Sequence, residues 1–326
     1  MLRLNEVGEF GLINRLRNML AVEAEGLPCG IGDDAVIVNT GQGLMVFTMD
    51  AMVEGVHFEM DYFSWHALGY KALAVNISDL AAMGASVPSF ALVTLGLKDD
   101  TEVEAVEEMY RGMMECGESF SSVVVGGDVV RSPSHVFVSV ALAGFLEDDG
   151  FLSRGGALPG QTILVTGTLG ESHLGLCWLR EGGSERNRCA RRHLYPLPRV
   201  EEGGVALSAG SSACIDISDG LIRDLGHICY ESGVGAELFL DSILVSGDAR
   251  ETARELGEDP QRAALYGGED YELILVAGGE SAAVLCEKLD ATVVGRITTG
   301  DGVRILDSEG GEVKLSESGY EHFREG

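Results

Sequence analysis

Aspartates recur beside apolar or glycine-rich segments in both halves of this sequence. Two adjacent ones lie in GIGDDAVIV (residues 30–38), and others end apolar runs such as LMVFTMD, VVVGGD and CIDISD. The set is Asp33, Asp34, Asp50, Asp79, Asp128, Asp216 and Asp219. Each of them alone can be explained as a helix cap or a turn residue. Together they favour a shared purpose, because burying several like charges is costly unless cations compensate them.

Hard divalent cations are the natural partners of such a set. No Lys or Arg lies within two positions of six of these acids, namely Asp33, Asp34, Asp50, Asp79, Asp216 and Asp219. Sites made only of oxygen ligands suit magnesium, manganese or calcium better than zinc, and magnesium commonly binds together with phosphate groups. Asp50, Asp128, Asp216 and Asp219 also fall where apolar strands are expected to end, and strand ends are where α/β folds collect ligands, whereas Asp79 ends AVNISD on an expected helix. The pattern therefore predicts a site for divalent metal and phosphate.

Glycines beside the acids support the phosphate part of this hypothesis. Gly30 and Gly32 flank the first aspartates, while GGD (126–128) and GGE (267–269) each place a glycine pair before an acid. Glycine allows backbone amides to approach an anion closely. The sequence contains neither G-x-x-x-x-G-K-[ST] nor G-x-G-x-x-G, so any nucleotide site is of another kind than a P-loop or Rossmann site. It also lacks H-E-x-x-H and G-x-S-x-G, which argues against common zinc proteases and esterases.

The composition excludes several other classes of protein. The 326 residues exceed the usual size of a single core, so we expect two domains of roughly 150 residues each. The net charge of −29 would repel nucleic acid and anionic membranes, and no run approaches the ~20 apolar residues of a spanning helix. Seven cysteines without a C-x-x-C pair indicate neither a disulfide framework nor a thiolate zinc site. We expect a cytoplasmic protein, whose acidity fits either a salty cytoplasm or the genome's composition.

Hydrophobic periodicity predicts alternating strands and helices in each half, hence an α/β (α+β) fold. In the first half the expected strands are 34–39, 44–49, 88–96, 122–126 and 135–145, and the expected helices are 64–83 and 102–119. In the second half the expected strands are 162–167, 213–218, 271–277 and 291–297, and the expected helices are 170–182, 219–232, 248–257 and 280–289.

The boundary between the two domains is expected near residue 150. FLSRGGALPGQ (151–161) is rich in Gly, Pro and Ser, which is typical of a linker. We therefore expect an N-terminal domain over 1–149 and a C-terminal domain over 150–326. Residues 183–212 are polar and contain two prolines, and no element is predicted there.

Read in order, the motifs resemble those of the thiamine-monophosphate kinase family, part of the superfamily that includes aminoimidazole ribonucleotide synthetase. The resemblance covers nearly the whole chain. It rests on GEFGLI (8–13), GIGDDA (30–35), TMDAMVEGVHF (48–58), GYKALAVNISDLAAMGA (69–85), GGDVVRSP (126–133), SRGGALPGQ (153–161), DISDGLIRDL (216–225), GGEDYEL (267–273) and GYEHF (319–323).

The resemblance implies an ATP-dependent kinase that phosphorylates thiamine monophosphate to thiamine diphosphate with several Mg²⁺ ions. It implies an N-terminal ATP- and metal-binding domain that also forms a homodimer, with the sheets of two copies paired into a barrel. A C-terminal α/β domain would complete the active-site cleft. Transfer would be direct and in line, without a covalent intermediate on the enzyme.

The resemblance also implies roles for individual residues. The metal ligands would be Asp34, Thr48, Asp50, Asp79, Asp128, Asp216 and Asp219, with Asp33 close by. Catalysis would depend most on Asp50, Asp128 and Asp219. ATP would contact Tyr110, Gly127, Asp128, Arg154 and Ser218, and thiamine monophosphate would contact His57, Glu269 and Tyr320.

Two positions depart from the family pattern. The family usually reads T-T-D where this chain has Thr48-Met49-Asp50, and GGDTTRSP where it has GGDVVRSP. Met49 can offer a metal only its backbone carbonyl, and Val129 and Val130 remove two hydroxyls beside Asp128. The sequence therefore leaves open how many metal ions bind near Asp50 and Asp128.

The sequence leaves two alternative functions open. Sister families of the superfamily make selenophosphate, aminoimidazole ribonucleotide or a hydrogenase-maturation thiocyanate; here Cys29 only precedes GIGDD, and the chain ends in GYEHFREG without a cysteine. A non-catalytic acidic metal-binding protein is the other alternative, although no segment has the D-x-[DN]-x-[DN]-G spacing of a calcium loop.

Overall fold

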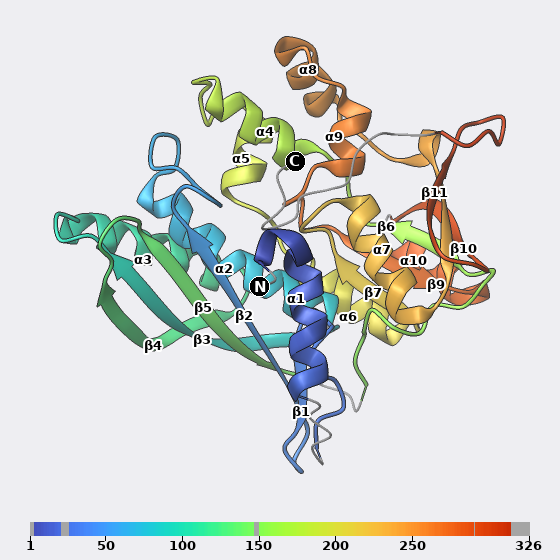
Figure 1. Ribbon diagram of the computed structural model, residues 1–326, viewed down its shortest axis with the longest axis horizontal. Coiled ribbons are helices and arrows are strands. Elements are labelled where there is room, and N and C mark those ends of the chain that lie inside the picture. The colour runs from blue at the N-terminus through green and yellow to red at the C-terminus, as the bar shows by residue number, and fades with distance from the viewer. Residues whose placement is uncertain (1–2, 21–25, 147–149, 290, 314–326) are drawn as a thin grey trace.

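Two β-sheets divide the chain into an N-terminal and a C-terminal half (Figure 1). The computed structural model describes residues 3–20, 26–146, 150–289 and 291–313. Helices cover the sheets, and the two halves meet along helix α2 (Trp65–Ala82). The α/β fold expected from the sequence is thereby confirmed.

The N-terminal sheet has five strands in the order β1-β2-β5-β3-β4. They are β1 (Val36–Asn39), β2 (Leu44–Val53), β3 (Ser86–Leu97), β4 (Ser122–Arg131) and β5 (Phe137–Phe145). Only the β3/β4 pair is parallel, while the other neighbours are antiparallel. Helices α2 and α3 (Val103–Ser119) cover one face of this sheet, and helix α1 (Leu4–Leu20) lies between the halves (Figure 1).

The C-terminal sheet has six strands in the order β11-β8-β10-β6-β9-β7. They are β6 (Thr162–Val165), β7 (Ala213–Asp216), β8 (Gly235–Phe239), β9 (Leu273–Ala277), β10 (Thr292–Thr298) and β11 (Gly302–Leu306). The helices of this half are α4 (Glu171–Arg180), α5 (Arg188–Leu194), α6 (Val200–Ser208), α7 (Leu221–Ser232), α8 (Gly247–Leu256), α9 (Pro260–Tyr266) and α10 (Gly279–Leu289), with a 3₁₀ turn at Leu240–Ser242.

Successive side chains along the C-terminal strands pack alternately into two different apolar cores. In β9, Ile274 and Val276 face a core that includes α7, whereas Leu273 and Leu275 face a core with α6 and α10. This alternation follows from the two-residue period of a strand. The second core also contains Ala82 at the end of α2, so the N-terminal helix packs against the C-terminal sheet.

Helix α2 is buried along nearly its whole length between the two halves. The Ser64 side chain begins the helix by accepting the Ala67 N–H at 3.1 Å. Helix α3 crosses α2 closely, because glycines lie at the contact: a Cβ on Gly69 would lie 1.8 Å from the Met109 carbonyl oxygen, and one on Gly112 would lie 1.9 Å from that of His66. Lys71, Asn76, Ser78 and Asp79 therefore have fixed places between the sheets.

Most elements expected from periodicity are present, with bounds shifted by a few residues. The sequence did not predict helices α1, α5, α6 and α9 or strands β8 and β11. Each is short, except α1, whose periodicity is interrupted by a kink at Gly8 with φ +68°. Two expectations were wrong in a way that bears on function: β2 and β4 continue beyond Asp50 and Asp128, so these acids lie within strands and not at their ends. The β-branched and apolar residues that follow them keep each strand extended.

Among the described helices, none combines the length and the apolar character needed to cross a bilayer.

Replacing Gly69 by Ala should destabilise the protein, because the new methyl group would enter the backbone of α3. We expect a loss of about 3 kcal/mol, the size of an overpacked core contact. Gly204→Ala is the matched control: this helical glycine in α6 faces open space, so alanine should add up to about 1 kcal/mol. Chemical denaturation measures both variants. Equal effects of the two substitutions would contradict the close α2/α3 crossing.

Candidate active site

A cavity of about 1470 Å³ runs between the two halves. This volume exceeds the roughly 300–1,000 Å³ that is usual for a pocket with one small ligand. Its walls contain the loop of residues 30–36, strand β2, and the loops of 216–219 and 266–271. Many of the site residues predicted from the sequence line this cavity: Asp34, Thr48, Asp50, His57, Asp79, Arg154, Asp216, Ser218, Asp219 and Glu269.

Three of the predicted metal ligands meet at the base of this cavity. Carboxylate oxygens of Asp34, Asp79 and Asp216 lie within 4.8 Å of one another. Asp34 comes from the loop before β1, Asp79 from α2 and Asp216 from the end of β7, so both halves contribute. The Thr48 hydroxyl donates to Asp79 at 2.5 Å, and the Ser78 hydroxyl donates to Asp216 at 2.6 Å. The sequence-based expectation that distant acids converge is confirmed for these three residues.

Burial and mutual repulsion disfavour the charged forms of these acids. Burial, followed by the charge of Asp34, raises the pKa of Asp216 to about 8. Burial also raises the pKa of Asp79 well above its ordinary value, and the nearby Asp50, Asp216 and Asp34 charges add to that shift. One buried oxygen of Asp34, Oδ2, has no hydrogen-bond partner among the described residues. The cluster therefore has a deficit of positive charge and one oxygen without a hydrogen bond. A divalent cation would supply the charge and bind that oxygen.

Arg154 lies against this cluster from the start of the C-terminal half. Its guanidinium bonds Asp34, with Nε 3.2 Å from Oδ1. Asp33 accepts the backbone N–H of Arg154 at 3.2 Å and that of Asp34 at 3.1 Å, so it holds the two chain segments together. The predicted proximity of Asp33 to the cluster is correct, and its carboxylate is engaged in backbone contacts.

Asp50 lies on strand β2 beside the same cluster. Its backbone N–H donates to Asn76 Oδ1 on α2 at 3.0 Å. Strand β1 pairs with β2 only up to Phe47, so Asn76 satisfies the Asp50 N–H, which β1 does not reach. Burial and the Asp34 charge raise the pKa of Asp50. Sequence reasoning missed this contact of Asn76 with the candidate site, since its only local signal is an amide within an apolar helix.

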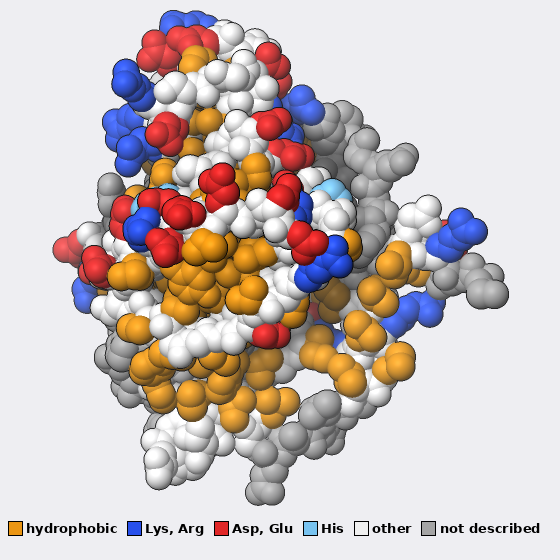
Figure 2. Space-filling model, turned by 90° about the vertical axis from the view of Figure 1, so that its left-hand side faces the viewer, with side chains coloured by type: hydrophobic (Ala, Val, Ile, Leu, Met, Phe, Trp, Pro, Cys, Tyr) orange, Lys and Arg blue, Asp and Glu red, His pale blue; other side chains and the backbone are white. Residues whose placement is uncertain are grey.

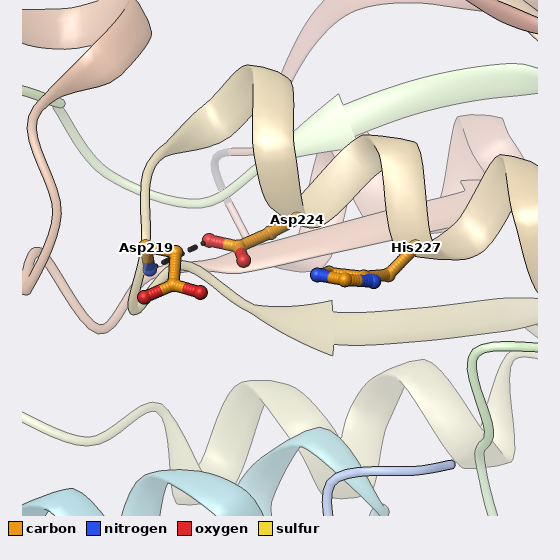
Figure 3. A group of neighbouring side chains, drawn as sticks. All are labelled: Asp219, Asp224 and His227. Atoms are coloured by element: carbon orange, nitrogen blue, oxygen red, sulfur yellow. Dashed lines mark hydrogen bonds between the residues drawn. The ribbon is translucent and has the colours of Figure 1, made fainter. Parts of the chain in front are cut away.

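The loop of residues 217–220 is shaped by a single carboxylate. Asp224 Oδ2 accepts the backbone N–H groups of Ser218, Asp219 and Gly220 at 3.0–3.1 Å. Figure 3 shows Asp224 pointing back from α7 toward Asp219, with His227 further along the same helix. Asp224 thus fixes the loop that carries Ser218 and Asp219, and the sequence indicated only its place in a helix.

The GGED segment lies directly on this loop. The Glu269 N–H donates to the Ser218 carbonyl at 2.8 Å, and the Tyr271 N–H to that of Ile217 at 2.9 Å. Glu269 and Tyr271 have positive φ angles of +65° and +52°, an uncommon conformation for such side chains. Gly268 is required between them and the loop, because a Cβ there would lie 2.4 Å from the Ser218 carbonyl oxygen. The predicted glycine pair therefore serves close backbone packing.

His57 and Glu269, both predicted to contact an acceptor molecule, line the cavity. The His57 Nδ1 accepts the backbone N–H of Val53 at 3.0 Å, so a neutral His57 ring carries its proton on Nε2. The third residue of that prediction, Tyr320, lies outside the described residues.

Tyr110, Gly127 and Asp128 do not line this cavity. Tyr110 packs on the N-terminal core from α3, and the other two lie on β4. Asp50 pairs with Val140, Val140 with Val93, and Val93 with Gly127, so three strand spacings separate the two ends of this row. At ~4.8 Å per spacing, Asp50 and Gly127 are roughly 14 Å apart. Within a single chain Asp128 does not join the other acids.

The two halves each match a family model. Residues 32–146 match the description "AIR synthase related protein, N-terminal domain", and residues 159–308 match "AIR synthase related protein, C-terminal domain". The fold and the cleft between its halves thus define an AIR synthase related protein.

Individual relatives narrow this class. The chain is 35% identical to the thiamine-monophosphate kinase of Aquifex aeolicus, covering 99% of this chain and 100% of the relative, and 32% identical to that of Bacillus subtilis, covering 97% and 99%. A solved structure described as "AaThiL complexed with AMPPCP and TMP" superposes with a TM-score of 0.88 at 34% identity over 99% of both chains. The chain belongs to the thiamine-monophosphate kinase family.

Removing one charge from the acidic cluster should stabilise the protein when no metal is present. We expect Asp79→Asn to raise the Tm of protein treated with chelator by about 2–4 °C, the shift that ~1 kcal/mol gives in a domain of this size. Added Mg²⁺ should stabilise the unaltered protein and have much less effect on the variant. Thermal unfolding with and without Mg²⁺ tests both points, with the exposed Asp100→Asn as control. An unchanged response of Asp79→Asn to Mg²⁺ would exclude metal binding there.

Proposed function

We propose that this protein transfers the γ-phosphoryl group of ATP to thiamine monophosphate, giving thiamine diphosphate and ADP. The observation that carries the proposal is the meeting of Asp34, Asp79 and Asp216 at the base of a cavity large enough for two phosphorylated molecules. Family membership supports the substrate pair, since a relative that superposes over the whole chain was solved with AMPPCP, an ATP analogue, and TMP. A cytoplasmic location stays a prediction of the sequence.

Several Mg²⁺ ions fit the donors that the cavity offers. Asp34, Asp79 and Asp216 would hold metal, with Thr48 and Asp50 beside them and Asp219 from the neighbouring loop. All these donors are oxygen atoms, and Asp34 Oδ2, which has no hydrogen-bond partner within the described part of the chain, supports a ligand role. When bound, Mg²⁺ neutralises charge on the phosphates that must approach each other.

The residues of the chain orient the two substrates in this scheme. Arg154, beside Asp34, would contact ATP phosphates, and Ser218 would present its hydroxyl from the loop held by Asp224. His57 can donate from Nε2, and Glu269 can accept from the organic part of the acceptor. The acceptor phosphate needs no general base, because its second pKa is about 6 and it is largely ionised near neutral pH.

The geometry gives no support to the selenophosphate alternative. Cys29, the cysteine closest to the GIGDD loop, hydrogen-bonds Asp33 at 3.5 Å. Burial, then the Asp33 charge, raises the pKa of the Cys29 thiol to about 12, so it stays protonated and a poor nucleophile. A purely calcium-binding role is also less well supported, because the acids converge from separate segments on a cavity and not within one loop.

A coupled assay with protein, ATP, Mg²⁺ and thiamine monophosphate tests the function directly. We expect thiamine diphosphate as product, with unphosphorylated thiamine a poor acceptor. Asp50→Asn should lower kcat by about 100-fold or more with an unchanged fold, as for removal of one electrostatic stabiliser of the transition state. Preference for thiamine, or near-normal turnover of Asp50→Asn, would overturn the assignment. Isothermal titration gives an independent readout, since a calcium-binding protein would bind metal and ignore thiamine monophosphate.

We also propose a division into domains near residues 149 and 150. The separate sheets support it, as do the family-model matches, which end at residue 146 and resume at 159. Residues 1–149 would bind ATP and metal and form the dimer, and residues 150–326 would complete the cleft.

A homodimer is the quaternary structure that the N-terminal sheet supports best. The face of this sheet opposite α2 and α3 exposes large apolar side chains, and Figure 2 shows the broad apolar surface on this side of the molecule. The exposed residues of this face, here called the apolar sheet face, are Phe47, Met49, Phe90, Leu92, Val123, Val125, Val130 and Phe145. A surface of this kind marks an interaction site, and Met49 and Val130 of this face are among the departures from the family pattern.

A second copy on the apolar sheet face would also explain where Asp128 lies. Asp128 pairs with Thr94 of β3. The side chains on either side of Thr94, Val93 and Leu95, are buried on the opposite face, so Thr94 and its partner Asp128 lie on the apolar sheet face. The cavity reaches Phe47 and Met49 of that face at the edge of β2. We propose that each site combines the acids of one chain with Tyr110, Gly127 and Asp128 of its partner.

Mixing two inactive variants tests the shared site. Asp50→Asn and Asp128→Asn should each be nearly inactive alone. When the two are co-expressed, half of the dimers are mixed and each carries one intact site, so about a quarter of the unaltered activity should return. The molar mass in solution gives the number of chains. A monomer, or mixed dimers without recovered activity, would exclude the shared site.

A further inference from the structure

Lys71 is a fully buried cation near the cavity that the proposed mechanism does not use. It lies on α2, its side chain is 0% exposed, and its Nζ is 3.0 Å from Glu269 Oε1. The Phe63 ring lies below it, with the centroid 5.5 Å from Nζ. Burying a lone ammonium group is costly, so its charge depends on the carboxylate partner.

Glu269 faces both Lys71 and the cavity. Its side chain is 27% exposed and belongs to the cavity wall, whereas Lys71 does not. Burial alone would raise the pKa of Glu269, but the charge and the hydrogen bond of Lys71 outweigh it and hold the pKa below the ordinary value. The backbone of Glu269 has little freedom, because its positive φ and its hydrogen bond to Ser218 set its position.

His193 completes the contact from the C-terminal half. Its Nδ1 lies 3.4 Å from Glu269 Oε2, 3.5 Å from Lys71 Nζ and 3.0 Å from the Ser172 hydroxyl. Burial and the Lys71 charge lower the pKa of His193 to about 3, so the ring is neutral. The positive charge closest to Glu269 in this group is therefore that of Lys71.

The neighbouring acids of GGEDYEL have partners of their own. Asp270 accepts the backbone N–H groups of Gly170 and Ser172 at the start of α4, and Glu272 bonds Arg192 and Arg199. These contacts fix the backbone of the segment without Lys71. Lys71 instead acts on the one acid of the segment that reaches the cavity.

We propose that Lys71 is a positioning residue for acceptor recognition: it holds the Glu269 carboxylate at the cavity wall, where the exposed part receives the positively charged or N–H-bearing rings of the acceptor. The inference rests on the proposed function, because thiamine monophosphate carries a cationic thiazolium ring and an aminopyrimidine. An ionised carboxylate is an acceptor-only group, which suits both ring types. Lys71 acts through Glu269 and does not touch the acceptor.

Steady-state kinetics of Lys71→Met, Glu269→Gln and the double variant test this proposal. We expect each single variant to raise the KM for thiamine monophosphate about tenfold, the loss of one charge-assisted contact, with kcat and the KM for ATP within about twofold. Because Lys71 acts through Glu269, adding Lys71→Met to Glu269→Gln should change that KM by less than about twofold. Independent, multiplying effects, or an equal loss for ATP, would overturn the proposal.

The double variant also covers a failure of Lys71→Met to fold. That single change leaves a buried carboxylate without its cation, whereas the double variant removes both charges and should recover the Tm. If the single variant is unfolded, the comparison of the double variant with Glu269→Gln decides the question. Lys98→Met is the matched control, since Lys98 pairs with Glu54 at 3.3 Å away from the cavity wall. Failure of the unaltered protein to phosphorylate thiamine monophosphate would instead refute the proposed function, so the two failures are distinct.

Discussion

Buried carboxylates that face one another are the constraint on which this structure depends. Asp34, Asp79 and Asp216 come from three separate segments and lie within 4.8 Å of one another, and Asp50 adds a fourth charge. Folding brings these charges together against their mutual repulsion, and burial raises that cost. Arg154 offsets part of the charge through Asp34. The remaining deficit is the physical basis for proposing that Mg²⁺ and phosphates complete the site.

Helix α2 is the element that makes this convergence possible. It is buried between the two halves, and Ser78 and Asp79 near its end meet Asp216 of the C-terminal sheet and Thr48 of the N-terminal sheet. Lys71 lies two turns earlier, about 12 Å along the axis, and contacts Glu269. A single rigid helix thus sets the spacing between the acidic cluster and the proposed contact for the organic part of the acceptor. The glycines at its crossing with α3 let it lie deep enough to do so.

The N-terminal sheet has two unlike faces. One packs on α2 and α3, while the apolar sheet face carries large side chains that a single chain leaves in contact with solvent. Asp128 belongs to this second face, and its neighbour Gly127 lies roughly 14 Å from Asp50 along the row of paired residues. Pairing with a second copy would cover the apolar side chains and bring the last predicted ligand to a site. In this proposal the metal site is complete only in the dimer.

The sequence by itself determined the element types and the chemistry of the site. Periodicity predicted the main strands and helices, and the aspartates with their glycines indicated an oxygen-ligand metal site, because these signals are local. Only the tertiary structure decided which acids meet. It placed Asp79 against Asp216 and left Asp128 apart, because both outcomes depend on strand order and helix packing between residues far apart in the chain. It also showed which groups Asn76, Asp224 and Lys71 contact at the site, since the partner of a buried polar group is set by the folded neighbours that replace water around it.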